Sequence, residues 1–267
     1  MSGFFKSLVM AFSTYSILPG AQKPATKENT RFILLFVPIV GVIIELLLVL
    51  GMKATPYLCN YTMLPAALCV VLPMILTKGS HVEGFVKTVD ALCAHKPREK
   101  KMQILADSHG GYFAIIICIS YFLIAVGTWS EMTTELDVVV PAMGFVLSRA
   151  LFGLSILTLK HASESKCKIY VPDNAAKFIE IVVLALVALG SAGYMIKTNP
   201  FVGGCCVAGA IVSYIYYWFV SKKHFGGITE DTAGFFLQVC EIVIPIVALL
   251  AFRRPISAVL AYEDLMM

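Results

Sequence analysis

Acidic, basic and histidine side chains are concentrated at residues 79–90, directly after an apolar run. This segment reads GSHVEGFVKTVD and contains His81 at its start. If the segment is helical, Glu83, Lys87 and Asp90 are spaced i, i+4 and i+7 and share one face. Charged groups gathered beside a membrane-length apolar run are typical of a functional site rather than of a lipid-facing surface.

A second polar segment, PREKKMQILADSHGG, occupies residues 97–111 and leads into another apolar run. Asp107 or Ser108 can cap the helix that follows. His109 and the neighbouring glycine amides then lie near a helix N-terminus, where anions bind well. We therefore expect this segment to contribute to a site for an anionic group.

A third segment, GGITEDTAGFFLQVCE, covers residues 226–241 and opens the last apolar run. Asp231, Gln238 and Glu241 share one helical face with Gly234, so that one carboxylate lies about three turns inside the helix end. Intramembrane carboxylates are costly and generally functional or paired.

Acidic residues at helix ends, close to glycines, lysines and arginines, suit phosphoryl chemistry. Carboxylates can hold Mg²⁺, which keeps water ligands and bridges substrate phosphates. The candidate metal ligands are Glu83, Asp90, Asp107, Asp231 and Glu241. Solvated loop carboxylates and helix caps remain the alternative interpretation, and a transporter can carry a similar set of residues.

Two further charged residues, Arg149 and Glu45, fall inside apolar runs. Arg149 should point into the helix bundle and meet Glu241 or a substrate phosphate. Glu45 matches no motif, and a buried hydrogen-bonded side chain is the default expectation. The basic run at residues 96–101 fits a membrane-surface segment better than a substrate clamp.

The composition predicts the element type that must position these residues. The chain has 267 residues, 58% hydrophobic and 14% charged, with a mean hydropathy of +0.83. Continuous apolar runs of about 20 residues match helices that cross a bilayer, whereas membrane β-barrels alternate apolar and polar residues. We predict an all-α, polytopic transmembrane bundle forming a single domain, 1–267. The seven predicted spans are 31–52, 63–78, 111–130, 137–158, 178–196, 201–221 and 233–252.

The lysines and arginines predict the orientation, because short basic loops stay in the cytoplasm. Sixteen of them fall on one side of the predicted spans and four on the other. The segments 19–30, 79–110, 159–177 and 222–232 should therefore be cytoplasmic, and with them the candidate site. The expected location is the cytoplasmic (inner) membrane.

Other features limit the alternatives. Most of the eight cysteines lie in apolar runs without CxxC spacing, which indicates reduced packing residues. The small net charge of +4 gives no support for nucleic-acid binding. The segment from Phe4 to Leu18 is too short to span, and we expect an interfacial helix. The sequence leaves open whether the chain forms a homo-oligomer.

At these segments the chain resembles the cobalamin synthase family of integral membrane enzymes. The opening AFSTYSILP and the run FVPIVG are similar to supporting motifs of that family. The family block G-G-x-H-x-D-G-x-x-D-x-x-D is matched at His81, Gly84 and Asp90. Glu83 is an inexact match, a glutamate where the family has an aspartate. The block R-E-x-K-x-x-I-L-x-D-S is matched at Arg98, Glu99, Lys101, Ile104, Leu105, Asp107 and Ser108. The block G-G-x-T-G-D-x-x-G and a later glutamate are matched at Gly226, Gly227, Thr229, Asp231, Gly234 and Glu241, and Ser148-Arg149-Ala150 is similar to an intramembrane S-R-A.

The resemblance implies a Mg²⁺-dependent transfer in vitamin B12 biosynthesis. In that reaction α-ribazole or its 5′-phosphate attacks the β-phosphorus of adenosylcobinamide-GDP and releases GMP. The catalytic residues implied are His81, Asp90, Asp107 and Asp231. The substrate-binding residues implied are Ser108, His109, Arg149, Thr229, Gly227 and Gly234.

The chain departs from the family pattern at Lys87 and Glu230 as well as at Glu83. Lys87 stands where the family has its central aspartate, and Glu230 replaces a glycine. A family member with impaired catalysis is therefore one alternative. A small secondary transporter that uses Glu45, Arg149 and Glu241 is another, and a bound Mg²⁺ among the carboxylates would decide for the enzyme.

Overall fold

A computed structural model describes residues 3–17, 31–58, 63–107, 110–132, 134–162 and 174–253. The described elements are α-helices apart from two short turns of other helical type and one isolated parallel bridge between His161 and Ile228. The helices and short turns are α1 (Gly3–Tyr15), η1 (Leu34–Phe36), α3 (Val37–Leu58), α4 (Met63–Leu76), α5 (Ser80–Cys93), α6 (Arg98–Ala106), α7 (Tyr112–Ser130), α8 (Glu135–Ala142), α9 (Gly144–Thr158), α10 (Asn174–Thr198), α11 (Pro200–Val220), η2 (Ser221–Phe225) and α12 (Glu230–Phe252). The prediction of a helical bundle is confirmed.

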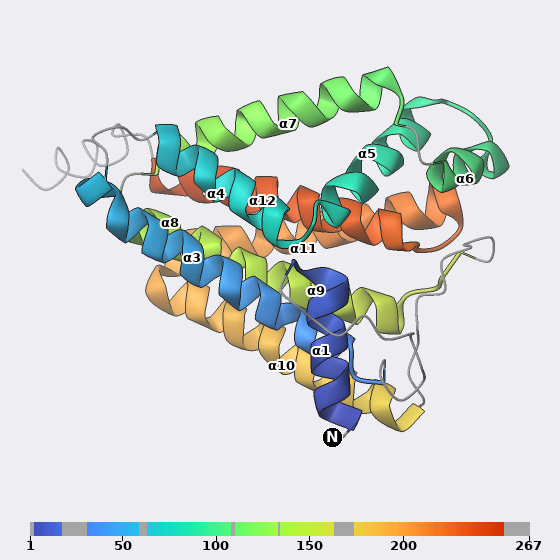
Figure 1. The fold of residues 1–267 in the computed structure, drawn as a ribbon, viewed down its shortest axis with the longest axis horizontal. Coiled ribbons are helices and arrows are strands. Elements are labelled where there is room, and N and C mark those ends of the chain that lie inside the picture. The colour runs from blue at the N-terminus through green and yellow to red at the C-terminus, as the bar shows by residue number, and fades with distance from the viewer. Residues whose placement is uncertain are drawn as a thin grey trace, which may run out of the picture.

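Six helical segments of the described chain are long and apolar enough to cross a membrane. They are Leu34–Ala54, Tyr112–Ser130, Asp137–Thr158, Asn174–Thr198, Pro200–Phe225 and Glu230–Phe252. Six of the seven predicted spans therefore have a counterpart of suitable length. Figure 1 shows these helices running roughly side by side along the long dimension of the molecule.

The predicted span 63–78 differs from the structure. α4 has only 14 residues, about 21 Å of helical rise, which is less than the roughly 30 Å hydrocarbon core. The chain turns at Lys78 and Gly79, which both have positive φ, and α5 continues at 92° to α4. The two helices pass the length and hydropathy test only as a bent pair, so the seventh span is a broken helix if it exists. The segment 79–110, predicted to connect two spans, contains α5 and α6, so Glu83, Lys87 and Asp90 do lie on one helix.

The interior of the bundle is centred on α9, which packs against α3, α10 and α12. A Cβ on Gly41 of α3 would lie 2.6 Å from the Phe145 carbonyl oxygen, so only glycine allows this close approach. Large apolar side chains on the outer helices remain exposed, among them Leu123, Leu189 and Val212. Lipid is the solvent that suits such surfaces.

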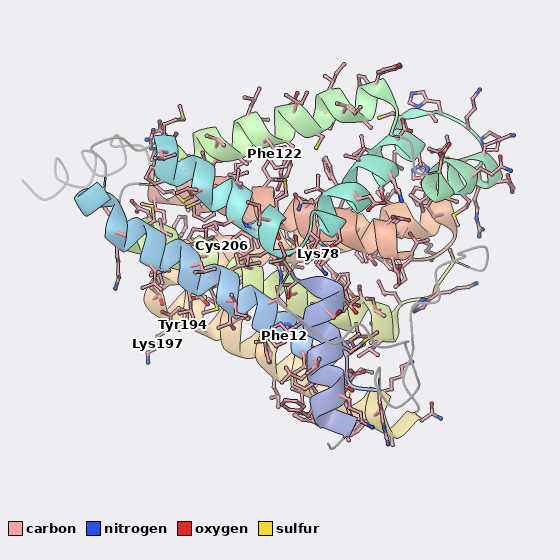
Figure 2. The ribbon with its side chains drawn as sticks, viewed as in Figure 1. Phe12, Lys78, Phe122, Tyr194, Lys197 and Cys206 are labelled. Atoms are coloured by element: carbon pink, nitrogen blue, oxygen red, sulfur yellow. The ribbon has the colours of Figure 1, made fainter. Side chains whose placement is uncertain are left out.

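The N-terminal helix α1 packs across the bundle instead of running along it (Figure 1). The Phe4 ring contacts Phe36 edge-on at 4.9 Å, and Lys78 Nζ donates a hydrogen bond to the Ser13 carbonyl at 2.9 Å. Figure 2 shows Lys78 close to the end of α1 that carries Phe12. α1 is therefore attached to the break between α4 and α5. The end of the predicted interfacial segment at Leu18 lies outside the described residues.

The six cysteines of the described chain are free thiols, as the sequence predicts. Half of them are fully buried. They act as small packing residues in the bundle.

Candidate active site

The predicted site is organised by the crossing of α5 and α12, which pack closely near their N-terminal ends. A Cβ on Gly84 would lie 2.7 Å from the Asp231 carbonyl oxygen. Gly234 faces the same contact, where its Cβ would lie 3.4 Å from the His81 backbone. Both glycines are therefore contact residues of two helices, and Gly234, predicted to bind substrate, lies in this interface.

Three charged side chains meet at this crossing, and we call them the crossing cluster: Glu83, Lys87 and Asp231. Lys87 Nζ lies 2.6 Å from a Glu83 carboxylate oxygen and 3.9 Å from Asp231 Oδ1. The side chains of Lys87 and Asp231 are 17% and 24% exposed, whereas that of Glu83 is 63% exposed. The cluster thus has a partly desolvated inner side and an open outer side.

Asp90 lies on α5 beyond this cluster. Its carboxylate is packed against the Cα of Gly111, the residue that precedes α7. A carboxylate at a helix N-terminus is stabilised by the backbone amides and the helix dipole. Asp90 therefore has a structural environment of its own in addition to its predicted catalytic and metal-binding roles.

Asp107 follows the last residue of α6 and is exposed. It lines an open depression of about 330 Å³ together with Lys96, Lys100, Gln103 and Ile104. The depression combines one carboxylate with two ammonium groups. Ser108 and His109, both predicted to bind substrate, lie outside the described residues.

The segment before α12 is held by backbone contacts. Gly227 packs so closely on residues 160–162 that a Cβ would lie 2.5 Å from the Ala162 nitrogen, and Ala162 N donates to the Ile228 carbonyl at 3.0 Å. Thr229 caps α12: its Oγ1 accepts from Thr232 N at 3.1 Å, and its own N–H donates to Thr232 Oγ1 at 2.8 Å. Gly227 and Thr229, predicted to bind substrate, here fix the start of the helix that carries Asp231.

A second polar group lies deeper along α12, about 15 Å beyond Asp231 at the helical rise. Arg149 Nη2 donates to Glu241 Oε1 at 2.9 Å, and Gln238 Nε2 donates to the other carboxylate oxygen at 3.2 Å. Arg149 Nη1 also donates to the Phe145 carbonyl at 3.2 Å. Arg149 is 1% exposed and Glu241 is 8% exposed. We call Arg149, Gln238 and Glu241 the buried network, and it contains the first of the two partners expected for Arg149.

His81 is 5% exposed and lies in the first turn of α5. Its ring meets Phe152 at a centroid distance of 6.4 Å, and the Tyr15 ring meets the same phenylalanine at 6.0 Å. Burial raises the pKa of the Tyr15 hydroxyl, with a further contribution from the Glu230 carboxylate, so this phenol stays neutral. Tyr15 was not among the predicted site residues, and only its place in the AFSTYSILP motif hinted at a role.

The described residues contain no group of three or more histidine, cysteine, aspartate or glutamate side chains arranged to hold a metal ion. In the crossing cluster the Lys87 ammonium lies close to both carboxylates. Glu241 uses both oxygens in the buried network. Mg²⁺ is usually held by one or two carboxylates together with water and substrate phosphates, so a larger cluster of protein ligands is not required for it.

Comparison with known proteins adds independent information. The family model described as cobalamin-5-phosphate synthase matches residues 7–249. An adenosylcobinamide-GDP ribazoletransferase of Lachnoclostridium phytofermentans is 29% identical over 93% of this chain and 95% of its own length. Proteins of the same name from Clostridium botulinum and Clostridium perfringens are 31% and 28% identical, each over at least 90% of this chain and 96% of their own. No solved structure matches the chain.

Proposed function

The chain belongs to the cobalamin-5-phosphate synthase family, and we propose that it is an adenosylcobinamide-GDP ribazoletransferase. A hydroxyl oxygen of α-ribazole, or of α-ribazole 5′-phosphate, attacks the β-phosphorus of adenosylcobinamide-GDP. The new bond joins this oxygen to the β-phosphorus. The bond from the β-phosphorus to the bridging oxygen breaks, and GMP leaves with that oxygen. The product is adenosylcobalamin or its 5′-phosphate.

The observation that carries this proposal is the crossing of α5 and α12. It places a cation and two carboxylates from two separate family motifs within reach of one another. Phosphoryl transfer requires mainly positioning of the reactants and neutralisation of phosphate oxygens. A partly open cluster at the end of a membrane bundle supplies both for a substrate with an apolar part and a phosphorylated part.

Each residue of the crossing cluster has a chemical task in this proposal. Lys87 donates hydrogen bonds to phosphate oxygens and lowers the cost of the charge that develops on them. Asp231, which is less exposed than Glu83, accepts the proton of the attacking hydroxyl or a hydrogen bond from it. His81 is buried beside Gly234, and we assign it to orienting this crossing.

Magnesium remains part of the proposal as an ion that arrives with the substrate diphosphate. When bound, it would neutralise phosphate oxygens, and Asp231 and Asp107 are the carboxylates that we assign to holding it. This arrangement does not require a preformed site in the protein.

We also propose that the site faces the cytoplasm in the inner membrane. α6 and η2 carry Lys100, Lys222 and Lys223 at one end of the bundle, and Lys96 precedes α6. Figure 2 places Lys197 at the opposite end. The lysine bias supports this orientation. Labelling of Lys96→Cys and Glu131→Cys, in a background without reactive native thiols, should reach them from opposite sides of the membrane.

The activity is tested with purified protein in nanodiscs, given adenosylcobinamide-GDP, α-ribazole 5′-phosphate and Mg²⁺. We expect GMP release in proportion to the protein added and a cobalamin product of matching amount. The control is Glu131→Gln at the other end of α7, which should release GMP at the wild-type rate. No GMP release from folded protein at any Mg²⁺ concentration would contradict the proposed function.

A further inference from the structure

The basic residues of α6 separate into two sets. Lys100 and the preceding Lys96 are exposed, as expected for a membrane-surface run. Lys101 is only 6% exposed, and Arg98 is half-buried. The inner pair faces η2 at the end of α11, with which α6 is in contact. The sequence gives no sign of this division, because the four cations lie within six consecutive residues.

Lys101 is held at a histidine. Its Nζ lies 3.0 Å from His224 Nδ1. Because an ammonium group can only donate, Nδ1 must accept, and the ring proton of the neutral imidazole is on Nε2. The Nε2–H group and the remaining ammonium hydrogens are donors available to a further partner.

Arg98 lies beside the glycine that ends η2. Gly226 has φ 72°, a left-handed conformation that favours glycine, and a Cβ at this position would overlap the Arg98 guanidinium. Arg98 Nε is buried and has no hydrogen-bond partner. An unpaired buried donor of a charged group is costly, because its lost hydration is not replaced by a hydrogen bond.

The backbone that brings His224 to α6 is itself unusual. Residues Ser221–Phe225 form a π-helical turn, a rare geometry found often at functional sites. The buried hydroxyl of Ser221 in the same turn also has no hydrogen-bond partner. A wide turn is thus kept at the point where it presents a histidine to Lys101.

The charge of this group has no carboxylate partner among the residues that the structure describes. In the part of the chain that the structure describes, neither Arg98 nor Lys101 forms an ion pair with a carboxylate, although Lys87 on the adjacent α5 has two such partners. Buried charges are normally paired because their desolvation is expensive. Two cations and a histidine without a counter-ion indicate that an anion completes the arrangement.

We propose that Arg98, Lys101 and His224 form a basic cluster that binds a phosphate group of one of the two substrates. This role in phosphate recognition rests on the proposed function; the cluster lies on α6, which packs against α5 of the crossing cluster, and on η2, which precedes α12. The phosphate belongs either to the nucleotide diphosphate or to the phosphomonoester of α-ribazole 5′-phosphate. Arginine matches a phosphate in a bidentate fork, and lysine adds a point charge.

The test measures binding to protein in phosphatidylcholine nanodiscs. The probes are GDP, α-ribazole 5′-phosphate and unphosphorylated α-ribazole. We expect Lys101→Met and Arg98→Gln each to weaken binding of one phosphorylated probe by on the order of tenfold or more. The probe that loses affinity identifies the source of the phosphate, and α-ribazole should bind both variants like wild type.

Lys222→Met is the matched control, because it removes an exposed lysine from the same turn as His224 and should leave all three affinities unchanged. Lys101→Met and Arg98→Gln are measured separately. If one of them does not fold, binding to the other still tests the basic cluster. Wild-type affinity for both phosphorylated probes in a folded variant would overturn the basic cluster.

The outcomes also separate this inference from the proposed function. GDP or α-ribazole 5′-phosphate binding that depends on Lys101, without GMP release, would support the basic cluster and contradict the transferase. GMP release by Lys101→Met and Arg98→Gln with wild-type KM for both substrates would support the transferase and overturn the basic cluster.

Discussion

The buried network and the crossing cluster use the same helix, α12, and the same kinds of side chain in opposite ways. In the buried network each oxygen of Glu241 accepts a hydrogen bond and both charged side chains are less than a tenth exposed. In the crossing cluster Lys87 lies near two carboxylates, one of which is mostly exposed. The hydrogen-bonded charges of the buried network hold two helices together, whereas the partly exposed charges of the crossing cluster can be reached by a ligand. A charged side chain inside a membrane protein can therefore be assigned to function or to structure only when its hydrogen-bond and ion-pair partners are known.

Arg149→Leu gives the largest expected effect on stability. It leaves Glu241 buried without its cation, which should cost about 3–5 kcal/mol. Thermal unfolding in detergent should show a lowered Tm, with reduced yield of folded protein. The double variant Arg149→Leu/Glu241→Leu should recover much of the loss. If Arg149→Leu unfolds like wild type, the buried network is not a structural pair.

Gly84→Ala tests whether the crossing itself matters. The added methyl group would press on the Asp231 backbone and should cost about 1–3 kcal/mol through overpacking. Turnover per folded molecule should also fall, because the displaced residue is the proposed catalytic carboxylate. Gly190→Ala is the control, since a Cβ there meets nothing within 4 Å. Equal behaviour of the two variants would argue against a tight crossing at Gly84.

Lys87→Asp changes the crossing cluster by two charge units and gives three carboxylates in place of two carboxylates and an ammonium. Mg²⁺ should then bind on the order of tenfold more tightly, equal to about 1.4 kcal/mol. Calorimetric Mg²⁺ titration and the Mg²⁺ dependence of GMP release both measure this. Lys197→Asp makes the same exchange on an exposed side chain at the opposite end of the bundle and is the control. An unchanged Mg²⁺ affinity together with lower turnover would mean that Lys87 contacts substrate directly.

Glu131→Gln gives the smallest expected effect. Its partner is Arg253, and both side chains are about half exposed. Exposed ion pairs contribute about 0–1 kcal/mol. The Tm should change by no more than a few degrees, and turnover should stay at the wild-type level. A large loss of either would mean that exposure is a poor guide to the importance of a charged pair in this protein.

The sequence predicted contacts that follow from helical spacing or from the cost of an intramembrane charge. Glu83 and Lys87 are four residues apart on one helix, and Arg149 had few partners available in the apolar interior. The contact between Lys87 and Asp231 joins distant parts of the chain, and spacing carries no information about it. It depends on Gly84 and Gly234, which matched motifs without revealing that they are packing residues.

The predicted span 63–78 was wrong for a physical reason. The apolar run at 63–78 has the hydropathy of a span, but its helix ends where Lys78 and Gly79 adopt positive φ. α5 was not among the predicted spans because its exposed face is polar, although His81, Phe85 and Thr88 are buried on its other face. The turn geometry of η2 and the inward direction of Lys101 likewise depend on packing between α6 and η2, which periodicity does not report.

The account is tested most directly by measuring GMP release and Tm side by side for Asp231→Asn and Glu241→Gln. Both variants replace a carboxylate of α12 by an amide of nearly the same shape. The predicted result is that Asp231→Asn loses turnover by on the order of a hundredfold or more with an unchanged Tm, because it removes transition-state stabilisation. Glu241→Gln should lower the Tm and keep most of the turnover per folded molecule. The reverse pattern, with an unstable Asp231→Asn and a stable but inactive Glu241→Gln, would contradict the assignment of the crossing cluster to chemistry and of the buried network to structure.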